Sequence, residues 1–242
     1  MFDLDVEKLR EEAKEAYPLE AVWLITEAKG CYQVENVHET PEHFFRVSAR
    51  DSATASLEGL LGVIHTHCDE PEVPSKADME LQIKLGVPCG IISTDGENAS
   101  DILWHTDEIQ PLEGRSFAHG VADCYSVVRD FYRLNGVELP EVPRNWQWWE
   151  EGDNFLEELF EEFGFYEVSD KEVREGDMWF AQIRSPVLHH CGIMLDNDLI
   201  LHHPGSHEPI DRTKISLKEP VYRYLTHIKK FLRHHDYTPP VR

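Results

Sequence analysis

Two histidines, a serine and an aspartate stand close together in the first half of the chain. His65 and His67 follow a short apolar run in the segment LLGVIHTHC. Because side chains alternate along a strand, both imidazoles are expected on one face. Ser75 and Asp78 fit the N-cap and first turn of the following helix. Two imidazoles and one carboxylate suit a zinc ion whose fourth position is left for water, which is the catalytic arrangement.

A cysteine and a group of histidines form a second set in the other half. Cys124 lies in the first turn of a helix predicted over DCYSVVRDFYRL, with Asp123 as its N-cap. The positive end of the helix dipole lowers the pKa of a thiol there and favours the nucleophilic thiolate. A buried cysteine without a catalytic role is the alternative. A nucleophile would need a base within hydrogen-bond reach and a third residue to orient that base.

The segment HHCGIMLDNDLILHH supplies candidates for both partners, because two apolar runs flank Asp-Asn-Asp and predict a hairpin. A three-residue loop pairs Gly192 with His202 and puts His190 and His202 on one face. A two-residue loop selects His203 instead. Cys124, His190 and His202 would then act as nucleophile, base and orienting residue.

The elements around the histidine pair predict an α/β sandwich over residues 1–107. An amphipathic helix over residues 4–16 opens it, and AVWLIT, CYQVENV and FFRVSA read as strands. The strand with the two histidines, a helix from Ser75 to Leu85, and the strands CGIIST and DILWHTD complete it. We expect a linker at residues 108–116, where EIQPLEGRS carries proline and glycine without a periodic pattern.

A second domain is predicted over residues 117–242, with the cysteine helix, the hairpin and a final strand near the C-terminus. The buried face of the helix should carry Val127, Val128, Phe131 and Leu134. The acidic run from Glu157 to Glu162 reads as the solvated face of a helix. We expect core or lid packing from Trp146, Trp148 and Trp149, in preference to a carbohydrate platform, and a surface position for His234 and His235.

The amino-acid composition limits the classes of partner that the chain can bind. The chain has 242 residues, enough for two cores, and a formal net charge of -23, which excludes nucleic acid as a partner. That charge favours docking to a basic protein, although a solvated surface explains it equally well. No apolar run approaches bilayer length, and the acidic N-terminus lacks the features of a secretory signal, so we expect no membrane span and synthesis in the cytosol. Five cysteines without CxxC spacing argue against a disulfide framework.

The first set resembles the signature of the JAB/JAMM metallopeptidases: His-x-His, seven residues, Ser, two residues, Asp. The resemblance implies zinc on His65, His67 and Asp78, with oxyanion support from the hydroxyl of Ser75. In that family an upstream glutamate on the first helix holds the water, and the matching segment YPLEAVWLI makes Glu20 the candidate. Cys68 stands where the family usually has proline, and it could compete for the metal.

The second set resembles the NlpC family of papain-like cysteine peptidases, in DCYSVVRDFY, EGDMWF and HCGIMLDNDLILHH. The family motif His-x-Gly-Ile selects His190 over His189 as the base, and the orienting residue twelve positions later is His202. Tyr125 and Ser126 replace the Ser-Gly that often follows the cysteine. The implied fold class is α+β, a JAB/MPN-like α/β sandwich followed by a papain-like NlpC domain.

This order of domains resembles the tail-tip peptidases of long-tailed bacteriophages. The resemblance implies synthesis in the host cytoplasm, a place at the virion tail tip or in an assembly intermediate, and tail hub and tip proteins as partners. It also implies hydrolysis of peptidoglycan peptides through acylation of Cys124, beside a zinc peptidase of unknown target. Two alternatives stay open: a structural tail component with idle sites, and a cellular isopeptidase that acts through the zinc domain.

Overall fold

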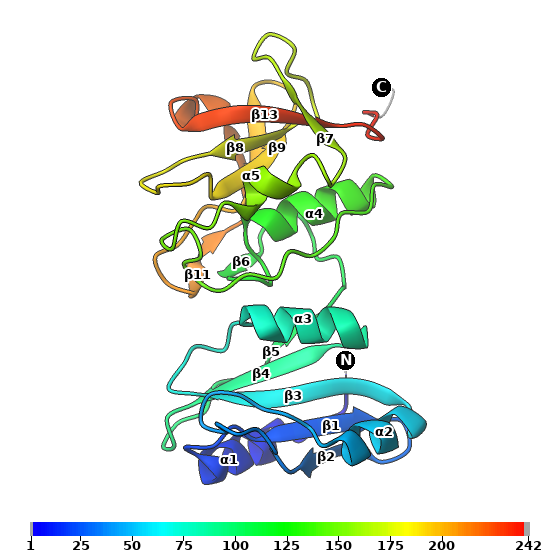
Figure 1. The fold of residues 1–242 in the computed structure, drawn as a ribbon. Helices are drawn as coiled ribbons and strands as arrows, with labels where there is room; N and C mark the ends of the chain where they lie inside the picture. The colour runs from blue at the N-terminus through cyan, green and yellow to red at the C-terminus, as the bar shows by residue number, and fades with distance from the viewer. Residues whose placement is uncertain (1, 240–242) are drawn as a thin grey trace. The chain divides into compact units, whose positions relative to one another are not determined.

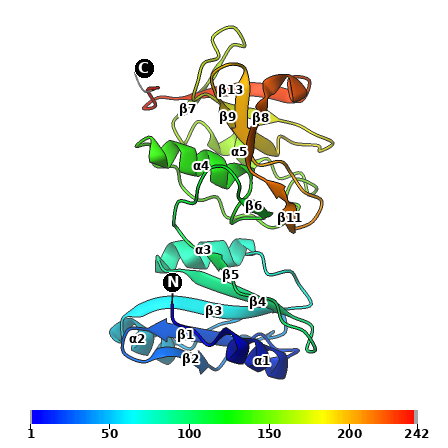
Figure 2. The ribbon, with the colours of Figure 1, turned by 180° about the vertical axis from the view of Figure 1, so that it is seen from behind.

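The chain divides into two compact units, Met1–Glu108 and Ile109–Arg242. The computed structural model, shown in Figures 1 and 2, describes residues 2–239. Both units combine helices with a sheet, so the predicted α+β class is confirmed. Within residues 2–239, none of the helices has the length and apolar character that a membrane crossing needs.

The first unit is a five-stranded sheet with helices on both faces, in the strand order β2-β1-β3-β4-β5 (Figure 1). Strands β3 and β4 pair in parallel and are joined by α3, while the other neighbours are antiparallel. The elements are α1 Val6–Ala16, β1 Val22–Thr26, β2 Gly30–Val34, α2 Ala49–Leu57, β3 Leu60–Cys68, α3 Lys76–Leu85, β4 Cys89–Thr94 and β5 Leu103–His105.

Alternation along β3 assigns its side chains to two separate cores. Ile64 packs with Leu9 of α1 on one face. Val63 packs on the other face, with Ala55 of α2 and Leu85 of α3. His65 and His67 share the parity of Val63, so both imidazoles lie on the face that α2 and α3 cover.

One predicted strand of the first unit is wrong. Residues 44–48, within FFRVSA, lie outside any strand, and the helix α2 begins immediately after them at Ala49. Ser48 caps this helix, because its Oγ accepts a hydrogen bond from the backbone N–H of Asp51 at 3.0 Å. The aromatic residues suggested a strand, but the Ser-x-x-Asp start of a helix decided the local structure.

The second unit has a six-stranded antiparallel sheet in the order β12-β10-β9-β8-β13-β7 and a separate pair, β11-β6. Its elements are β6 Ser116–Ala118, α4 Cys124–Leu134, α5 Phe155–Leu159, β7 Phe165–Val168, β8 Met178–Ala181, β9 His190–Met194, β10 Leu199–His202, β11 Ile210–Ile215, β12 Leu217–Pro220, the 3-10 helix Val221–Arg223 and β13 Ile228–His234. Helix α4 packs against β9 and β10. This contact brings the start of α4 to the hairpin.

Two expectations for the second unit need correction. Leu134, predicted on the buried face of α4, is 59% exposed because the helix ends there, beyond the edge of the core. His234, predicted at the surface, is buried, and its Nε2–H donates to the carbonyl of Phe163 at 2.9 Å. The reason is that β13 is an interior strand of the sheet, with β7 and β8 on its two sides.

The segment predicted as a linker has contacts of its own. Arg115 is buried, and its Nη1 lies 2.8 Å from a carboxylate oxygen of Asp130 on α4. The same guanidinium donates to the carbonyls of Gln110 and Pro111. The C-terminal part of residues 108–116 is therefore folded into the second unit.

Candidate active sites

Cys124 is the first residue of α4, where a capping box fixes the first turn. Asp123 Oδ1 accepts from the backbone N–H of Ser126 at 3.0 Å, and Ser126 Oγ accepts from the N–H of Asp123 at 2.8 Å. The thiol therefore lies at the positive end of the helix. Its pKa is well below the usual range, because the thiol of Cys191 and the imidazole of His190 outweigh the opposing effect of burial.

His190 and His202 come together as the three-residue loop predicts. In the β9–β10 hairpin Gly192 pairs with His202, and the N–H of Leu195 donates to the carbonyl of Leu199 across the loop. His190 Nε2 then lies 3.0 Å from His202 Nδ1, and both rings are buried. Beyond them, His202 Nε2 lies 2.7 Å from Oε1 of Glu219 on β12.

The other two histidines of the hairpin are turned to different partners. The ring of His189 faces Trp149, with 5.5 Å between the centroids, and only its carbonyl approaches Cys124 Sγ, at 3.9 Å. His203 Nε2 lies 2.8 Å from the carbonyl of Arg115. The structure thus brings together Cys124, His190 and His202, and the rings of His189 and His203 lie outside this group.

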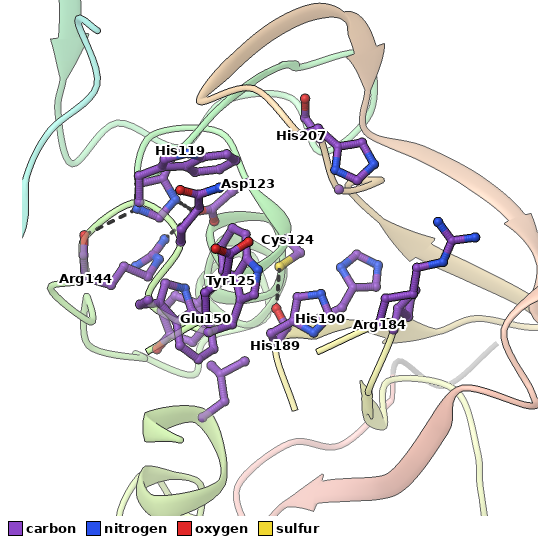
Figure 3. Close-up of a pocket in the computed structure, with 18 of the residues that line it drawn as sticks. His119, Asp123, Cys124, Tyr125, Arg144, Glu150, Arg184, His189, His190 and His207 are labelled. Atoms are coloured by element: carbon purple, nitrogen blue, oxygen red, sulfur yellow. Dashed lines mark hydrogen bonds and ion pairs between the residues drawn. The ribbon is translucent and has the colours of Figure 1, made fainter. Parts of the chain in front are cut away.

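A cavity of about 460 Å³ opens beside the thiol, as Figure 3 shows. Cys124 and His190 line it, and Trp146 and Trp149 contribute aromatic surface. Trp148 also lines the cavity but is buried, and its ring centroid lies 4.0 Å from that of Phe155. The expected core packing therefore describes Trp148, while the other two indoles can contact a molecule in the cavity.

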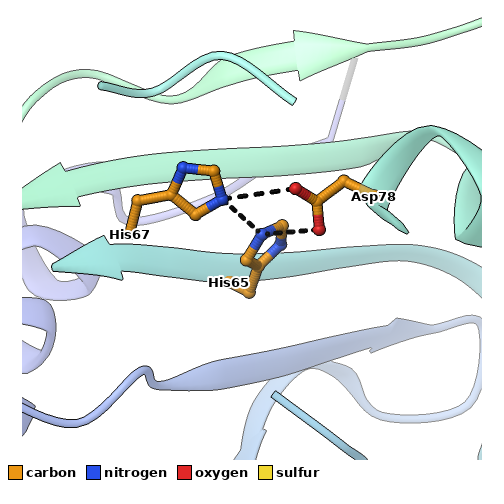
Figure 4. Close-up of side chains that lie close together, drawn as sticks. All are labelled: His65, His67 and Asp78. Atoms are coloured by element: carbon orange, nitrogen blue, oxygen red, sulfur yellow. Dashed lines mark hydrogen bonds and ion pairs between the residues drawn. The ribbon is translucent and has the colours of Figure 1, made fainter. Parts of the chain in front are cut away.

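The histidine pair of the first unit lies against a carboxylate from α3, as Figure 4 shows. The Nε2 atoms of His65 and His67 are 3.1 Å apart, and they lie 3.2 and 3.3 Å from the two carboxylate oxygens of Asp78. Donors that bind one tetrahedral ion at 2.0–2.2 Å are separated by roughly 3.3 Å. The three side chains therefore fit a zinc-sized ion.

An outer contact of His67 supports the same role. His67 Nδ1–H donates to the carbonyl of Pro71 at 2.8 Å, which presents the unprotonated Nε2 to the site. His65 Nδ1 is buried and has no hydrogen-bond partner within residues 2–239. Burial lowers the pKa of His65, so this ring is favoured in the neutral, metal-binding form.

Glu20 opens onto the same cavity as His67 and Asp78. The family places its glutamate on the first helix, but α1 ends at Ala16 and Glu20 lies in the connection to β1. Val22 pairs with His65, and Glu20 shares the parity of Val22, so its side chain points to the same face. Burial is the main cause that raises the pKa of Glu20 to about 8.

Ser75 and Cys68 are placed differently from the metal-site donors. Ser75 Oγ accepts from the N–H of Asp78 at 3.2 Å and the N–H of Ser75 donates to Oδ2 of Asp78 at 2.8 Å, which completes a capping box on α3. Ser75 Oγ also donates to Oδ2 of Asp78 at 2.6 Å. The hydroxyl of Ser75 thus holds the carboxylate of Asp78 beside His65 and His67. Cys68 alternates to the α1 face of β3 and is not part of the His65, His67 and Asp78 group.

Family models match both units. The model of the NlpC/P60 family matches residues 114–229, and the model of prokaryotic homologs of the JAB domain matches residues 5–107. Tail tip assembly protein K of Escherichia phage lambda is 30% identical over 158 residues, which are 65% of this chain and 76% of the lambda protein. The chain belongs to the family of phage tail tip assembly protein K.

A second member of the protein K family agrees over a longer stretch. Tail tip assembly protein K of Escherichia phage N15 is 28% identical over 209 residues, which are 84% of this chain and 85% of the N15 protein. A crystal structure of an NLP/P60 family protein from Staphylococcus aureus is 18% identical, covers 51% of this chain and 37% of that chain, and has a TM-score of 0.34. The resemblance predicted from the sequence is confirmed.

Two residues of this protein K family member were missed by the sequence analysis. Glu219 reaches His202 from a strand whose place in the sheet no local pattern reveals. Arg144 lies in the cavity wall and its Nη2 donates to Oδ2 of Asp123 at 2.6 Å, both side chains being buried. An arginine within an otherwise acidic and aromatic insertion was the available signal for the second residue.

Proposed function

We propose that this member of the protein K family is a cysteine peptidase of peptidoglycan peptides, with Cys124 as nucleophile, His190 as base and His202 as the residue that orients the base. The observation that carries the proposal is the chain of contacts from the helix-terminal thiol through two buried imidazoles beside an open cavity. The match to the NlpC/P60 family model over the same residues supports it.

In the proposed reaction, His190 accepts the thiol proton of Cys124 and the thiolate attacks the carbonyl carbon of a peptide bond. The first turn of α4 points its backbone N–H groups beyond the start of the helix, where they can donate to the developing oxyanion. The imidazolium of His190 then protonates the leaving amine, which departs as the C–N bond breaks and leaves a thioester on Cys124. Water, deprotonated by the same imidazole, releases the acid and restores the thiol.

The proposal includes a zinc peptidase site in the first unit, whose target the chain does not identify. His65, His67 and Asp78 are the residues that would hold the ion, and the donor spacing supports this assignment. Zinc, when bound, would lower the pKa of water and polarise a carbonyl. Glu20 is placed to hold a proton in the same cavity, and its raised pKa suits a general base near neutral pH.

For partners, we propose the tail hub and tip proteins, by analogy with the names of the two relatives. The net charge of -23 favours a basic docking surface on such a partner. On this proposal the protein is made in the host cytoplasm and acts at the virion tail tip or in an assembly intermediate. Family membership favours this interpretation over a cellular isopeptidase, while a structural component with idle sites is the alternative that the experiment must separate.

The experiment is digestion of purified peptidoglycan by wild type, Cys124→Ala and His65→Ala, with products identified by mass spectrometry and zinc measured on the same samples. We expect wild type and His65→Ala to release wall peptides, Cys124→Ala to release none, and only His65→Ala to lose its zinc. Absence of cleavage by every form, with zinc also absent from wild type, would favour the structural alternative. Cleavage by Cys124→Ala would contradict the nucleophile assignment.

A further inference from the structure

We propose that Glu219 is a positioning residue that sets the protonation of the His190–His202 pair, so that His190 offers an unprotonated nitrogen to Cys124. The proposal rests on the function proposed for the cysteine site, and it adds a fourth member to the chain of contacts. Sequence patterns gave no reason to select this glutamate, because it lies within an ordinary polar segment, KISLKEP.

Strand pairing brings Glu219 to His202. In the β10–β12 pair Glu219 is directly opposite Ile200, which makes His202 its diagonal neighbour on the same face. Oε1 lies 2.7 Å from His202 Nε2, and Oε2 lies 2.7 Å from Nη1 of Arg223. Glu219 is 8% exposed and His202 is 0% exposed, so solvent screens their contact only weakly.

The chemistry of the carboxylate fixes the hydrogens in turn. An ionised carboxylate only accepts hydrogen bonds, so His202 Nε2 must carry its proton toward Glu219. In the neutral ring His202 Nδ1 is then an acceptor, and His190 Nε2–H donates to it across 3.0 Å. This leaves Nδ1 as the unprotonated nitrogen of a neutral His190, the form that can take the thiol proton.

Without the negative charge the opposite arrangement becomes available. His202 Nδ1–H could donate to His190 Nε2, which would place the remaining proton of His190 on Nδ1 and remove the base. The carboxylate also stabilises positive charge on the pair once the thiol proton has moved. A glutamate held ionised at this end therefore favours both the correct tautomer and the thiolate.

The surrounding groups keep Glu219 ionised. Burial raises its pKa, but hydrogen bonds from His202 and Arg223 outweigh this, so the pKa lies below the ordinary value. Other charged or titratable groups also face the side chains of Glu219, His202 and His190. His203 lies beside His202, and His189 and Cys124 lie beside His190. Tyr224 lies against Glu219 and both imidazole rings. Among the described residues, no carboxylate other than that of Glu219 contacts the ring of His190 or His202.

The test measures the rate at which iodoacetamide alkylates Cys124 as a function of pH, quantified on the Cys124 peptide by mass spectrometry. In Glu219→Gln we expect the midpoint of the alkylation profile to move about one unit to higher pH, so that alkylation slows by about tenfold at pH values below that midpoint. Glu219→Asp keeps the charge and should recover part of the rate. Glu113→Gln is the matched control, since Glu113 pairs with Lys218 on the same strand at the surface, 2.7 Å away, and should leave the profile unchanged.

A folded Glu219→Gln protein with the wild-type alkylation profile would overturn the proposal. A second measurement avoids variants altogether, because ¹⁵N NMR of the wild-type imidazoles reports their tautomers. We expect a proton on Nε2 of His202 and none on Nδ1, and a proton on Nδ1 of His202 would also overturn the proposal. Neither measurement uses a peptide substrate, so failure to cleave peptidoglycan would refute the proposed function without touching this result.

Discussion

His190 Nε2 and His202 Nδ1 lie 3.0 Å apart across the two strands of the β9–β10 hairpin, whose loop is three residues long. The relationship depends on loop length, because a shift of the register by one residue would turn His202 to the opposite face. It also depends on the start of β9, where His190 is the first residue of the strand and reaches the thiol at the tip of α4. The length of the hairpin loop and the start of β9 therefore both determine the position of these two rings.

Replacement of His202 should impair chemistry more than binding. We expect His202→Ala to lower kcat by about 100-fold with little change in KM, because the base loses the partner that orients it but the cavity wall stays intact. His202→Asn should recover part of the loss through its own hydrogen bond. Steady-state kinetics on a wall peptide measures both. His203→Ala is the control, and an equal loss in that variant would show that the effect is structural.

Cys191 should influence the nucleophile without taking part in the reaction. It is the first cause of the lowered pKa of Cys124 and is itself fully buried. In Cys191→Ala the pKa of Cys124 should therefore rise, and the midpoint of Cys124 alkylation should move to higher pH. Cys89→Ala removes another buried thiol, from the first unit, and should leave the midpoint unchanged. A midpoint that is the same in both variants and in wild type would refute this role.

Ser75 should have two separable effects, on stability and on metal affinity. It caps α3 as Ser48 caps α2, so Ser75→Ala and Ser48→Ala should each cost about 1 kcal/mol of unfolding free energy in the metal-free protein. Only Ser75 also donates to Asp78, at 2.6 Å. Ser75→Ala should therefore weaken zinc binding by roughly 10- to 100-fold, and Ser48→Ala should not. Denaturant titration and zinc competition assays measure the two effects, and equal zinc affinity in both variants would contradict the prediction.

Arg144 should be important for stability, because it neutralises the buried carboxylate of Asp123. Its Nη1 also donates to Glu141 at 2.9 Å. Arg144→Met would leave an uncompensated buried charge and should lower the unfolding free energy by about 3–5 kcal/mol. Urea unfolding of the variant tests this. The double variant Arg144→Met, Asp123→Asn should regain part of the loss, and a larger loss in the double variant would show that the two side chains stabilise the fold independently.

The sequence was most informative where the chemistry depends on local structure. The spacing of His65 and His67 on one strand, the cap of α3 at Ser75 and the cap of α4 at Asp123 are local features, and each is present as predicted. Strong alternation and helix-capping signals leave few alternatives over such short distances. The hairpin loop could also be narrowed to two choices from the residues alone.

Contacts that depend on strand order could not be obtained in this way. Glu219 reaches His202 only because β12 lies beside β10, and His234 is buried only because β13 lies between β7 and β8. A single sequence carries no local record of which strands become neighbours. The missed helix α2 has another cause, since its sequence ARDSATASL carries only a weak apolar pattern.

The proposed mechanism requires Cys124 to form a covalent acyl intermediate with a peptidoglycan peptide. The most direct measurement is the mass of the intact protein after acid quenching during turnover of a defined wall peptide, followed by location of the added mass in a digest. We expect an adduct of the acyl fragment on Cys124, absent from Cys124→Ala. Continued turnover with no adduct at Cys124, or turnover by Cys124→Ala, would contradict it.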